Sequence, residues 1–127
     1  MVSLKAIHHV AIICSDYTKS KKFYSETLGL RILAENYRAE RNSYKLDLAL
    51  GDHYVIELFS FPNPPQRVSR PEACGLRHLA FLVDDIEAAI KNMPSIAFEP
   101  IRIDEFTGKK FTFFSDPDGL PLELYEK

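Results

Sequence analysis

The sequence predicts an α+β fold of two βαβββ modules, which form a curled mixed sheet with the helices outside. Three observations lead to this prediction: an internal repeat, short β-rich segments in both halves, and a helix-like segment after an aspartate in each half. A chain of 127 residues has the length of one compact domain. We therefore expect a single domain over 1–127, with modules at 4–61 and 76–127 joined by a linker at 62–75.

The internal repeat aligns two segments that each begin with a histidine. The segments are His9-Val-Ala-Ile-Ile-Cys-Ser-Asp16 and His78-Leu-Ala-Phe-Leu-Val-Asp-Asp85, whose histidine, alanine and last aspartate match at an offset of 69 residues. Each half later carries an apolar strand with a central glutamate, Glu57 or Glu123, which follows the histidine by 48 or 45 residues. Two histidines and two glutamates therefore occupy equivalent places in two similar halves.

The first module is predicted as one strand, one helix and three strands. Residues 5–14 are apolar and β-rich, which favours a strand. Asp16 is a good N-cap for the next helix, and Gly29 is well placed to end it. Gly51-Asp52 is a hairpin turn signal. The remaining strands are expected near 30–37, 43–50 and 53–60.

The second module repeats this order. Its helix is expected near 85–92, with Asp84 or Asp85 as N-cap, and Asp116-Pro117-Asp118-Gly119 predicts a tight turn. Its strands are expected near 76–83, 97–103, 110–115 and 120–126. Four prolines between the modules predict a stiff connector: Pro62, Pro64, Pro65 and Pro71.

Composition excludes several classes of protein. The net charge of −2 and the scattered charges of both signs give no footprint for nucleic acid. The longest apolar stretches are strand-sized, which argues against a membrane protein, and the N-terminal segment lacks the features of a signal peptide. We expect a cytoplasmic protein in which Cys14 and Cys74 are free and inert.

The four repeated residues predict a metal centre. A carboxylate on an otherwise apolar strand needs a partner, because burying an isolated charge is costly. Two imidazoles and two carboxylates satisfy this need around one divalent cation, Zn or Ni first and Co, Mn or Fe as alternatives. Taken singly, each residue is more often an ordinary core or surface residue, but the repeat favours the metal site. The expected ligands are His9, Glu57, His78 and Glu123.

The chemistry expected at this centre uses the positions that four protein ligands leave open. A metal that prefers six ligands keeps two for water or substrate oxygens, and can stabilise an enolate there. Glu57 or Glu123 is then the candidate general base. His8 is expected to point to the other face of its strand, toward the helices, and to be structural.

Two further motifs carry a family resemblance. Phe23-Tyr24-x-x-x-Leu28-Gly29-Leu30 and Asp116-Pro117-Asp118-Gly119-x-x-x-Glu123, taken with the two histidine segments, resemble the vicinal oxygen chelate superfamily of glyoxalase I and the bleomycin-resistance proteins. The resemblance covers nearly the whole chain. It implies the same fold, one divalent metal per site, a homodimer and a small-molecule substrate. The ligand set of two histidines and two glutamates resembles that of glyoxalase I, whereas the superfamily's dioxygenases and fosfomycin enzymes typically use one glutamate.

The resemblance implies a metal-dependent lyase or isomerase, related to lactoylglutathione lyase, for a small α-oxygenated carbonyl or its thiol adduct. One position departs from the pattern, because Ile13 stands where glyoxalase I usually has an arginine for a glutathione carboxylate. An Fe(II) extradiol-type dioxygenase and a non-catalytic drug-binding protein are the alternatives. Candidate substrate contacts are Phe59, Phe111, Phe113 and Arg77, with Arg38, Arg41 and Lys45 as further cations.

Overall fold

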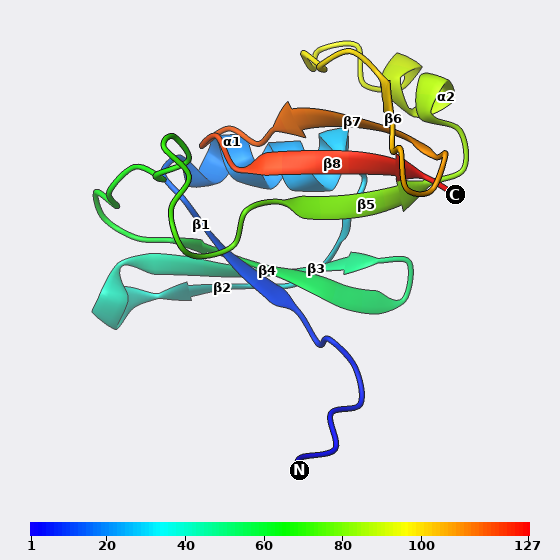
Figure 1. The fold of residues 1–127 in the computed structure, drawn as a ribbon. Coiled ribbons are helices and arrows are strands. Elements are labelled where there is room, and N and C mark those ends of the chain that lie inside the picture. Colours follow the sequence, from blue (N-terminus) through cyan, green and yellow to red (C-terminus); the bar gives the residue numbers. More distant parts are fainter. The chain divides into compact units, whose positions relative to one another are not determined.

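The computed structural model describes residues 1–127, which form two compact units, 1–65 and 66–127. Each unit holds one four-stranded mixed sheet (Figure 1). The prediction of two βαβββ modules is confirmed, and each sheet stays open rather than closing into a barrel. The module limits and the linker at 62–75 remain predictions.

The first unit has its strands in the order β1-β4-β3-β2, with β1 parallel to β4 and the other pairs antiparallel. Its elements are β1 (Val10–Cys14), α1 (Tyr17–Lys22), the π-helical turn η1 (Phe23–Thr27), β2 (Arg31–Arg38), the 3-10 turn η2 (Ala39–Arg41), β3 (Ser43–Leu50) and β4 (His53–Ser60).

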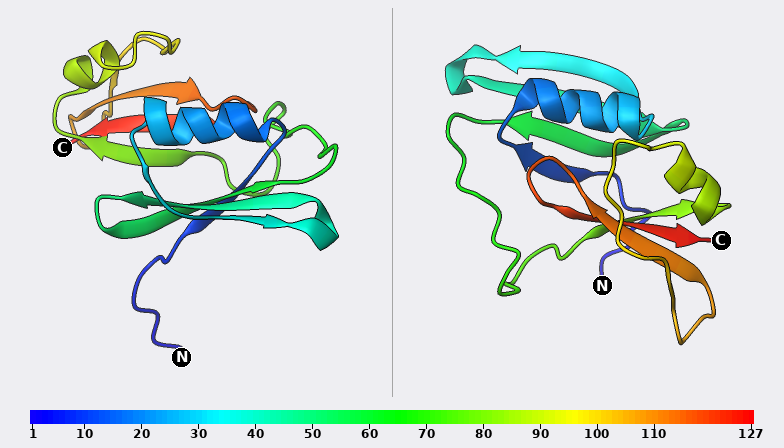
Figure 2. Two further views of the ribbon diagram at one scale, coloured as in Figure 1. Left: turned by 180° about the vertical axis from the view of Figure 1, so that it is seen from behind. Right: turned by 90° about the horizontal axis from the view of Figure 1, so that it is seen from above.

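The helix of the first unit begins and ends where the sequence predicts. The Asp16 carboxylate accepts a hydrogen bond from the Lys19 N–H at 3.1 Å, so Asp16 is the N-cap. The chain leaves the helix at Gly29, whose φ of +74° is a left-handed conformation that favours glycine. The helix α1 packs on the sheet at β4 (Figure 2).

The second unit repeats the topology with the strand order β5-β8-β7-β6, and β5 is parallel to β8. Asp85 is the N-cap of its helix, since its carboxylate accepts from the Ala88 N–H at 3.1 Å. The elements are β5 (Leu79–Val83), α2 (Ile86–Lys91), β6 (Arg102–Ile103), β7 (Lys110–Ser115) and β8 (Pro121–Glu126).

The turn between β7 and β8 is held by one carboxylate. Asp116 is buried, and its Oδ1 accepts hydrogen bonds from the N–H groups of Asp118 at 2.8 Å and Leu120 at 2.9 Å. Gly119 has a φ of +84°, which the tight turn requires. The predicted Asp-Pro-Asp-Gly turn is therefore present, and it sets the register that places Glu123 on β8.

Three strands are shorter than expected. The strand predicted at 5–14 starts at Val10, and the one predicted at 76–83 starts at Leu79. The strand predicted at 97–103 is reduced to Arg102–Ile103, because Pro100 has no N–H to donate to a neighbouring strand. The segment before it keeps one hydrogen bond of the kind that pairs β-strands, from the Glu99 N–H to the Phe113 carbonyl at 2.9 Å.

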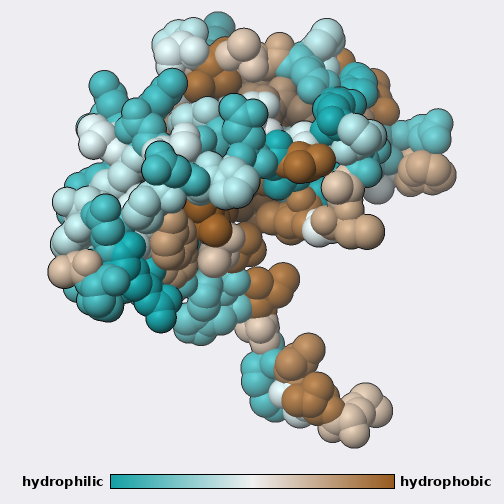
Figure 3. Space-filling view, turned by 90° about the vertical axis from the view of Figure 1, so that its left-hand side faces the viewer, coloured by the Kyte–Doolittle hydropathy of each residue, from teal (hydrophilic) through white to brown (hydrophobic).

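The segment before β1 is exposed. Val2, Leu4 and Ile7 are 76%, 85% and 87% exposed, so the apolar character of this stretch does not reflect burial within the unit. Figure 3 shows it as an arm that projects from the surface, with both hydrophobic and hydrophilic residues along it.

Each sheet separates an apolar face from a polar one. In the first unit Leu46, Leu48, Ile56 and Leu58 are fully buried on one face, since alternate residues of a strand share a face. The opposite face carries Glu57, which pairs with Ala11 on β1 and with Asp47 on β3. In the second unit Glu123 lies in the same place, paired with Ala80 on β5 and Phe113 on β7, opposite a face that carries Thr112, Phe114, Leu122 and Leu124.

No helix of the structure is long and apolar enough to cross a lipid bilayer.

Candidate metal centre

The first histidine–glutamate pair lies entirely within the first unit. His9 directly precedes β1, and its Nε2 is 3.8 Å from Oε2 of Glu57 on the parallel neighbour β4. The Glu57 side chain is 16% exposed and that of His9 is 34% exposed, so the carboxylate is largely withdrawn from water. The parallel β1–β4 pairing is what brings two residues 48 positions apart in the sequence to one place.

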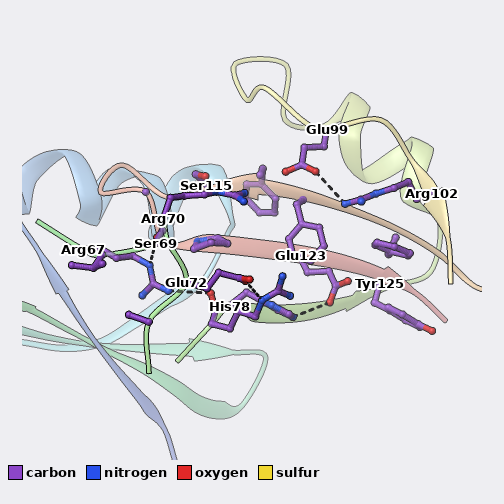
Figure 4. A pocket seen from close by; sticks show the side chains of 18 of the residues that line it. Arg67, Ser69, Arg70, Glu72, His78, Glu99, Arg102, Ser115, Glu123 and Tyr125 are labelled. Atoms are coloured by element: carbon purple, nitrogen blue, oxygen red, sulfur yellow. Dashed lines mark hydrogen bonds and ion pairs between the residues drawn. The ribbon is translucent and has the colours of Figure 1, made fainter. Parts of the chain in front are cut away.

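The second pair lies within the second unit and has the same construction. His78 directly precedes β5, and its Nε2 is 3.4 Å from Oε1 of Glu123 on β8. The Phe113 ring packs edge-on against the His78 ring, with the ring centroids 5.1 Å apart. The Glu123 side chain is 13% exposed. Figure 4 shows His78 and Glu123 pointing toward each other.

Both pairs fit the spacing of neighbouring metal ligands. Two ligand atoms that are each about 2.1 Å from one metal ion lie roughly 3–3.5 Å apart. The separation of 3.4 Å in the second unit matches this range, and the 3.8 Å of the first needs only a small side-chain movement. Both distances are too long for a strong hydrogen bond between the histidine and the glutamate. In each pair the imidazole nitrogen and the carboxylate oxygen therefore do not satisfy each other.

Glu57 is held by a network that the sequence did not reveal. The Tyr54 hydroxyl lies 2.8 Å from both Glu57 Oε2 and Asp47 Oδ1. Lys45 Nζ lies 2.7 Å from Asp47 Oδ1 and 3.3 Å from Glu57 Oε2. A phenol has one proton and donates to one carboxylate at a time, so the Lys45 ammonium supplies the second favourable contact that two adjacent carboxylates require.

The hydrogen bonds of this network favour the ionised form of Asp47. Burial alone would raise the pKa of Asp47, but the hydrogen bonds from Lys45 and Tyr54 outweigh it and lower that pKa. The hydrogen bond to Asp47 raises the pKa of Lys45, and burial together with the two carboxylates raises the pKa of Tyr54. Lys45, expected as a contact for an anionic substrate, instead forms ion pairs within the protein. Its place on the same strand face as Asp47, two residues away, is the only sequence signal for this pairing.

His8 does not have the position expected for it. It is exposed rather than packed toward a helix, and its Nδ1 lies 2.8 Å from Nδ1 of His9. Its ring also contacts the Tyr54 ring, with centroids 5.2 Å apart. The expectation failed because the strand starts only at Val10, so the alternation of faces does not extend back to residue 8.

The second unit contains a pocket of about 720 Å³ that includes its histidine–glutamate pair. Phe111, Phe113 and Arg77, the expected substrate contacts of this unit, line it together with His78 and Glu123. The pocket also has three further arginines that the sequence did not single out: Arg67, Arg70 and Arg102.

Phe59, the expected contact of the first unit, lies on the same face of β4 as Glu57. The Arg38 guanidinium lies over its ring, 4.8 Å from the centroid, and also over Phe61 at 5.7 Å. Arg38 is thus engaged with aromatic rings. Arg41 is exposed on η2.

Comparison with known proteins agrees with this architecture. The sequence is 63% identical over 126 residues to YwkD, an uncharacterized protein of Bacillus subtilis (strain 168), covering 98% of both chains. A solved glyoxalase family protein from Enterococcus faecalis is 55% identical, with a TM-score of 0.89 over 96% of this chain and 98% of that one.

More distant similarity reaches proteins with named activities. Glutathione transferase FosA of Serratia marcescens is 31% identical over 124 residues, which are 96% of this chain and 81% of FosA. Trypanothione-dependent glyoxalase I of Leishmania major is 26% identical, with a TM-score of 0.72 over 97% of this chain and 87% of that one. The profile of the Glyoxalase/Bleomycin resistance protein/Dioxygenase superfamily matches residues 6–124. The resemblance to the vicinal oxygen chelate proteins is therefore confirmed, and the chain belongs to this superfamily.

Proposed function

We propose that the protein is a divalent-metal-dependent lyase or isomerase of the glyoxalase I type. Its substrate is a small α-oxygenated carbonyl compound or the thiol adduct of one. The observation that carries this proposal is the pair of equivalent histidine–glutamate contacts, at 3.8 Å in one unit and 3.4 Å in the other. Similarity to a glyoxalase I described as trypanothione-dependent supports both the reaction class and a thiol adduct.

His9, Glu57, His78 and Glu123 are the proposed ligands of one metal ion, with Zn or Ni as the first candidates and Co, Mn or Fe as alternatives. Two imidazole nitrogens and two carboxylates form a neutral set with a divalent ion, and this donor chemistry suits these metals. A bound ion of this kind polarises substrate oxygens and acidifies the adjacent C–H bond.

Glu123 is the better placed of the two glutamates to move a proton. Glu57 is held by contacts to Tyr54 and Lys45, which fix its position. Glu123 instead has apolar neighbours across the sheet, Ala80 and Phe113, and its one ion-pair partner is His78. A carboxylate that no ammonium or hydroxyl group holds in place moves more easily between a ligand position and a reacting C–H group. In the proposed reaction Glu123 removes the proton and returns it, while Glu57 stays a ligand.

The same sheet faces offer the proposed substrate contacts. Phe111 and Phe113 form an apolar wall beside Glu123, and Arg77 stands at the edge of the same pocket. Phe59 provides a ring on the face of Glu57. Ile13, in place of the arginine of glyoxalase I, removes one contact for a glutathione carboxylate. The thiol of the adduct therefore need not be glutathione.

Metal content tests the central claim. Tag-free protein, purified without chelator and measured by elemental mass spectrometry, is expected to hold about one divalent metal per proposed site. The His78→Ala variant is expected to lose it, and a His53→Ala variant, which changes an exposed histidine, is expected to keep it. Wild-type protein that stays metal-free after reconstitution with Zn²⁺, Ni²⁺, Co²⁺, Mn²⁺ and Fe²⁺ would contradict the proposal.

A second candidate is a glutathione-dependent transferase. The 31% identity to glutathione transferase FosA favours it. The superfamily's fosfomycin enzymes typically have one glutamate ligand, so the second histidine–glutamate pair favours the lyase or isomerase. The product distinguishes the two, since a transferase forms a new bond between the glutathione sulfur and an electrophilic substrate, whereas an isomerase rearranges an adduct already formed and leaves its mass unchanged. Bound iron together with oxygen consumption would indicate the dioxygenase alternative. Binding of a small molecule without turnover would indicate the drug-binding alternative.

The protein is also proposed to be a homodimer. Ile13 on β1 and Leu82 on β5 are 55% and 66% exposed, which is unusual for aliphatic residues on paired strands. Sedimentation equilibrium is expected to give twice the mass of the chain. A monomer at micromolar concentration would contradict this proposal.

A further inference from the structure

The N-terminal arm, residues 1–8, carries apolar side chains that the chain itself leaves in water. The arm belongs to no helix or strand, and Figure 1 shows it leaving the start of β1 as an extended segment. Val2, Leu4 and Ile7 are 76%, 85% and 87% exposed. Single exposed aliphatic residues are common, but several of them in one short segment mark a surface for a partner.

The backbone of the arm is as free as its side chains. Strand pairing in the first sheet begins at Val10, so the N–H and C=O groups of residues 1–8 take no part in it. The hydrogen bond from Lys5 Nζ to Ser3 Oγ, at 3.1 Å, stays within the arm. An extended segment with apolar side chains and free backbone groups is suited to join the unpaired edge of a β-sheet.

The same chain offers such edges. β1 and β5 each lie at one end of their sheet, so each has an edge that pairs with no other strand of that sheet. Both strands also present an aliphatic side chain to water, since Ile13 is 55% and Leu82 is 66% exposed. One chain therefore carries an apolar arm and an apolar edge that could receive it, and a dimer with two-fold symmetry uses such a pair twice.

The composition of the arm fits a protein surface better than a lipid surface. Lys5 is its only lysine or arginine. Segments that bind anionic membranes combine their apolar residues with several basic ones. The unpaired backbone groups also favour a strand edge, which offers hydrogen-bond partners that a lipid surface does not offer in a regular row.

Two arms are large enough to hold two chains together. An unfolded chain exposes about 1.45 Å² per dalton, so a segment of about 900 Da exposes roughly 1,300 Å². With about half of that area against a partner, two arms bury roughly 1,300 Å², and the surfaces that receive them lose a similar area. Stable protein interfaces bury about 1,200–2,000 Å² in total.

From these observations we infer that the arm docks on the unpaired edge of β1 or β5 in a second copy of this chain, and that the two copies exchange arms. The inference rests on the proposed homodimer and assigns the segment that holds it together. Because the arm leads directly into His9, a docked arm also fixes the backbone before a candidate metal ligand.

The first experiment removes the apolar side chains and keeps the length of the chain. The arm variant replaces the three exposed aliphatic residues: Val2→Ser, Leu4→Ser and Ile7→Ser. The control variant replaces three aliphatic residues elsewhere that are 42%, 51% and 63% exposed: Leu33→Ser, Leu50→Ser and Val68→Ser. Sedimentation equilibrium is expected to give a dimer dissociation constant at least about 100-fold higher for the arm variant, and within about threefold of the wild type for the control.

Folding of the arm variant is checked by circular dichroism. The arm lies outside both sheets, so the variant is expected to keep the wild-type spectrum.

The second experiment identifies the chain that the arm contacts. ¹⁵N-labelled protein with the photoreactive residue p-benzoylphenylalanine in place of Leu4 is mixed with unlabelled wild-type protein and irradiated. Mass spectrometry is expected to find labelled arm peptides joined to unlabelled peptides from β1 or β5. A lysine at that edge, Ile13→Lys or Leu82→Lys, is expected to abolish the cross-link, because an edge lysine opposes the addition of a strand.

The outcomes separate this inference from the proposed function. A wild-type monomer, an arm variant that dimerises like the wild type, or cross-links that stay within one chain or reach other surfaces would each overturn the docked arm. Substitutions in the arm that abolish binding to phosphatidylglycerol vesicles but not dimerisation would assign it to a lipid surface instead. Dissociation of the arm variant, with cross-links between chains, would support the inference even if the protein binds no metal and the lyase proposal fails.

Discussion

At the scale of single residues, the two glutamates of the candidate metal centre differ in their surroundings. Glu57 has a hydroxyl at 2.8 Å and an ammonium at 3.3 Å, whereas Glu123 has apolar neighbours across the sheet. Groups that hydrogen-bond a metal ligand fix its orientation and strengthen metal binding. A carboxylate with fewer partners moves more easily. The geometry therefore supports a division in which Glu57 retains the metal and Glu123 moves the proton.

This division predicts the effect of Glu123→Gln. The amide keeps the shape and an oxygen that can contact a metal, but it cannot accept a proton as a base. Turnover is expected to fall by at least about 100-fold while metal content stays near that of the wild type. Steady-state kinetics with parallel elemental analysis provide the measurement, and Glu26→Gln, at an exposed position, serves as the control. Unchanged turnover would remove Glu123 from the role of base.

Tyr54→Phe tests the role of the network around Glu57. Without the hydroxyl, Glu57 and Asp47 lose their shared donor and face each other with Lys45 alone. Metal affinity is expected to fall about tenfold, and stability by about 1 kcal/mol. Competition with a fluorescent chelator measures the affinity. His53→Gln on the same strand is exposed and is expected to show neither effect, so equal affinities in the two variants would contradict this role.

At the scale of elements, α1 and β2 are linked by one acidic residue. Glu35 on β2 accepts hydrogen bonds from Lys21 Nζ at 2.8 Å and from the Tyr17 hydroxyl, both on α1. Those two hydrogen bonds, from Lys21 first, lower the pKa of Glu35 below its usual value. A lowered pKa in the folded state means that this stabilisation is present at neutral pH, above the unfolded-state pKa, and is lost as pH falls through the folded-state pKa.

Glu35→Gln is therefore expected to destabilise the protein at pH 7 and to have a smaller effect at pH 3. The side chain is 34% exposed, so the loss at pH 7 is expected to stay below about 1 kcal/mol. Urea unfolding of the wild type and the variant at the two pH values measures the difference. A penalty of equal size at both values would show that the carboxylate charge does not stabilise the helix–sheet contact.

The elements also show how far sequence reasoning reaches. β3 and β4 were predicted with correct limits because their residues alternate and a turn signal at Gly51 separates them. The histidine–glutamate pairs were found because the repeat marks equivalent positions. The network of Lys45, Asp47 and Tyr54 was not found, since it depends on the register between β3 and β4. That register shifts between Leu48 and Ala49, and no local pattern in the sequence predicts the shift.

At the scale of the whole molecule, the proposed metal would bind only the folded chain, and so would stabilise it. Free metal at 100 times its dissociation constant adds about 2.7 kcal/mol to the free energy of unfolding. Because the proposed ligands come from both units, His9→Ala and His78→Ala are each expected to remove most of this gain. Calorimetry with and without added metal measures it, and His53→Ala controls for the loss of a histidine.

If only one of the two histidine substitutions removed the stabilisation, the ion would be held by a single unit. That result would contradict the four-ligand centre while leaving one histidine–glutamate pair as a metal site.

The internal duplication has a consequence for how such a protein changes over evolutionary time. The position beside the first glutamate is Asp47, and the corresponding position beside the second is Phe113. The two units share one topology but differ at this position, where the first carries a carboxylate and the second an aromatic ring. Substitutions in β7 can therefore change the lining of the pocket in the second unit without changing the network of Lys45, Asp47 and Tyr54 around Glu57. The repeated topology lets the two units change separately, since each holds its histidine–glutamate pair within itself.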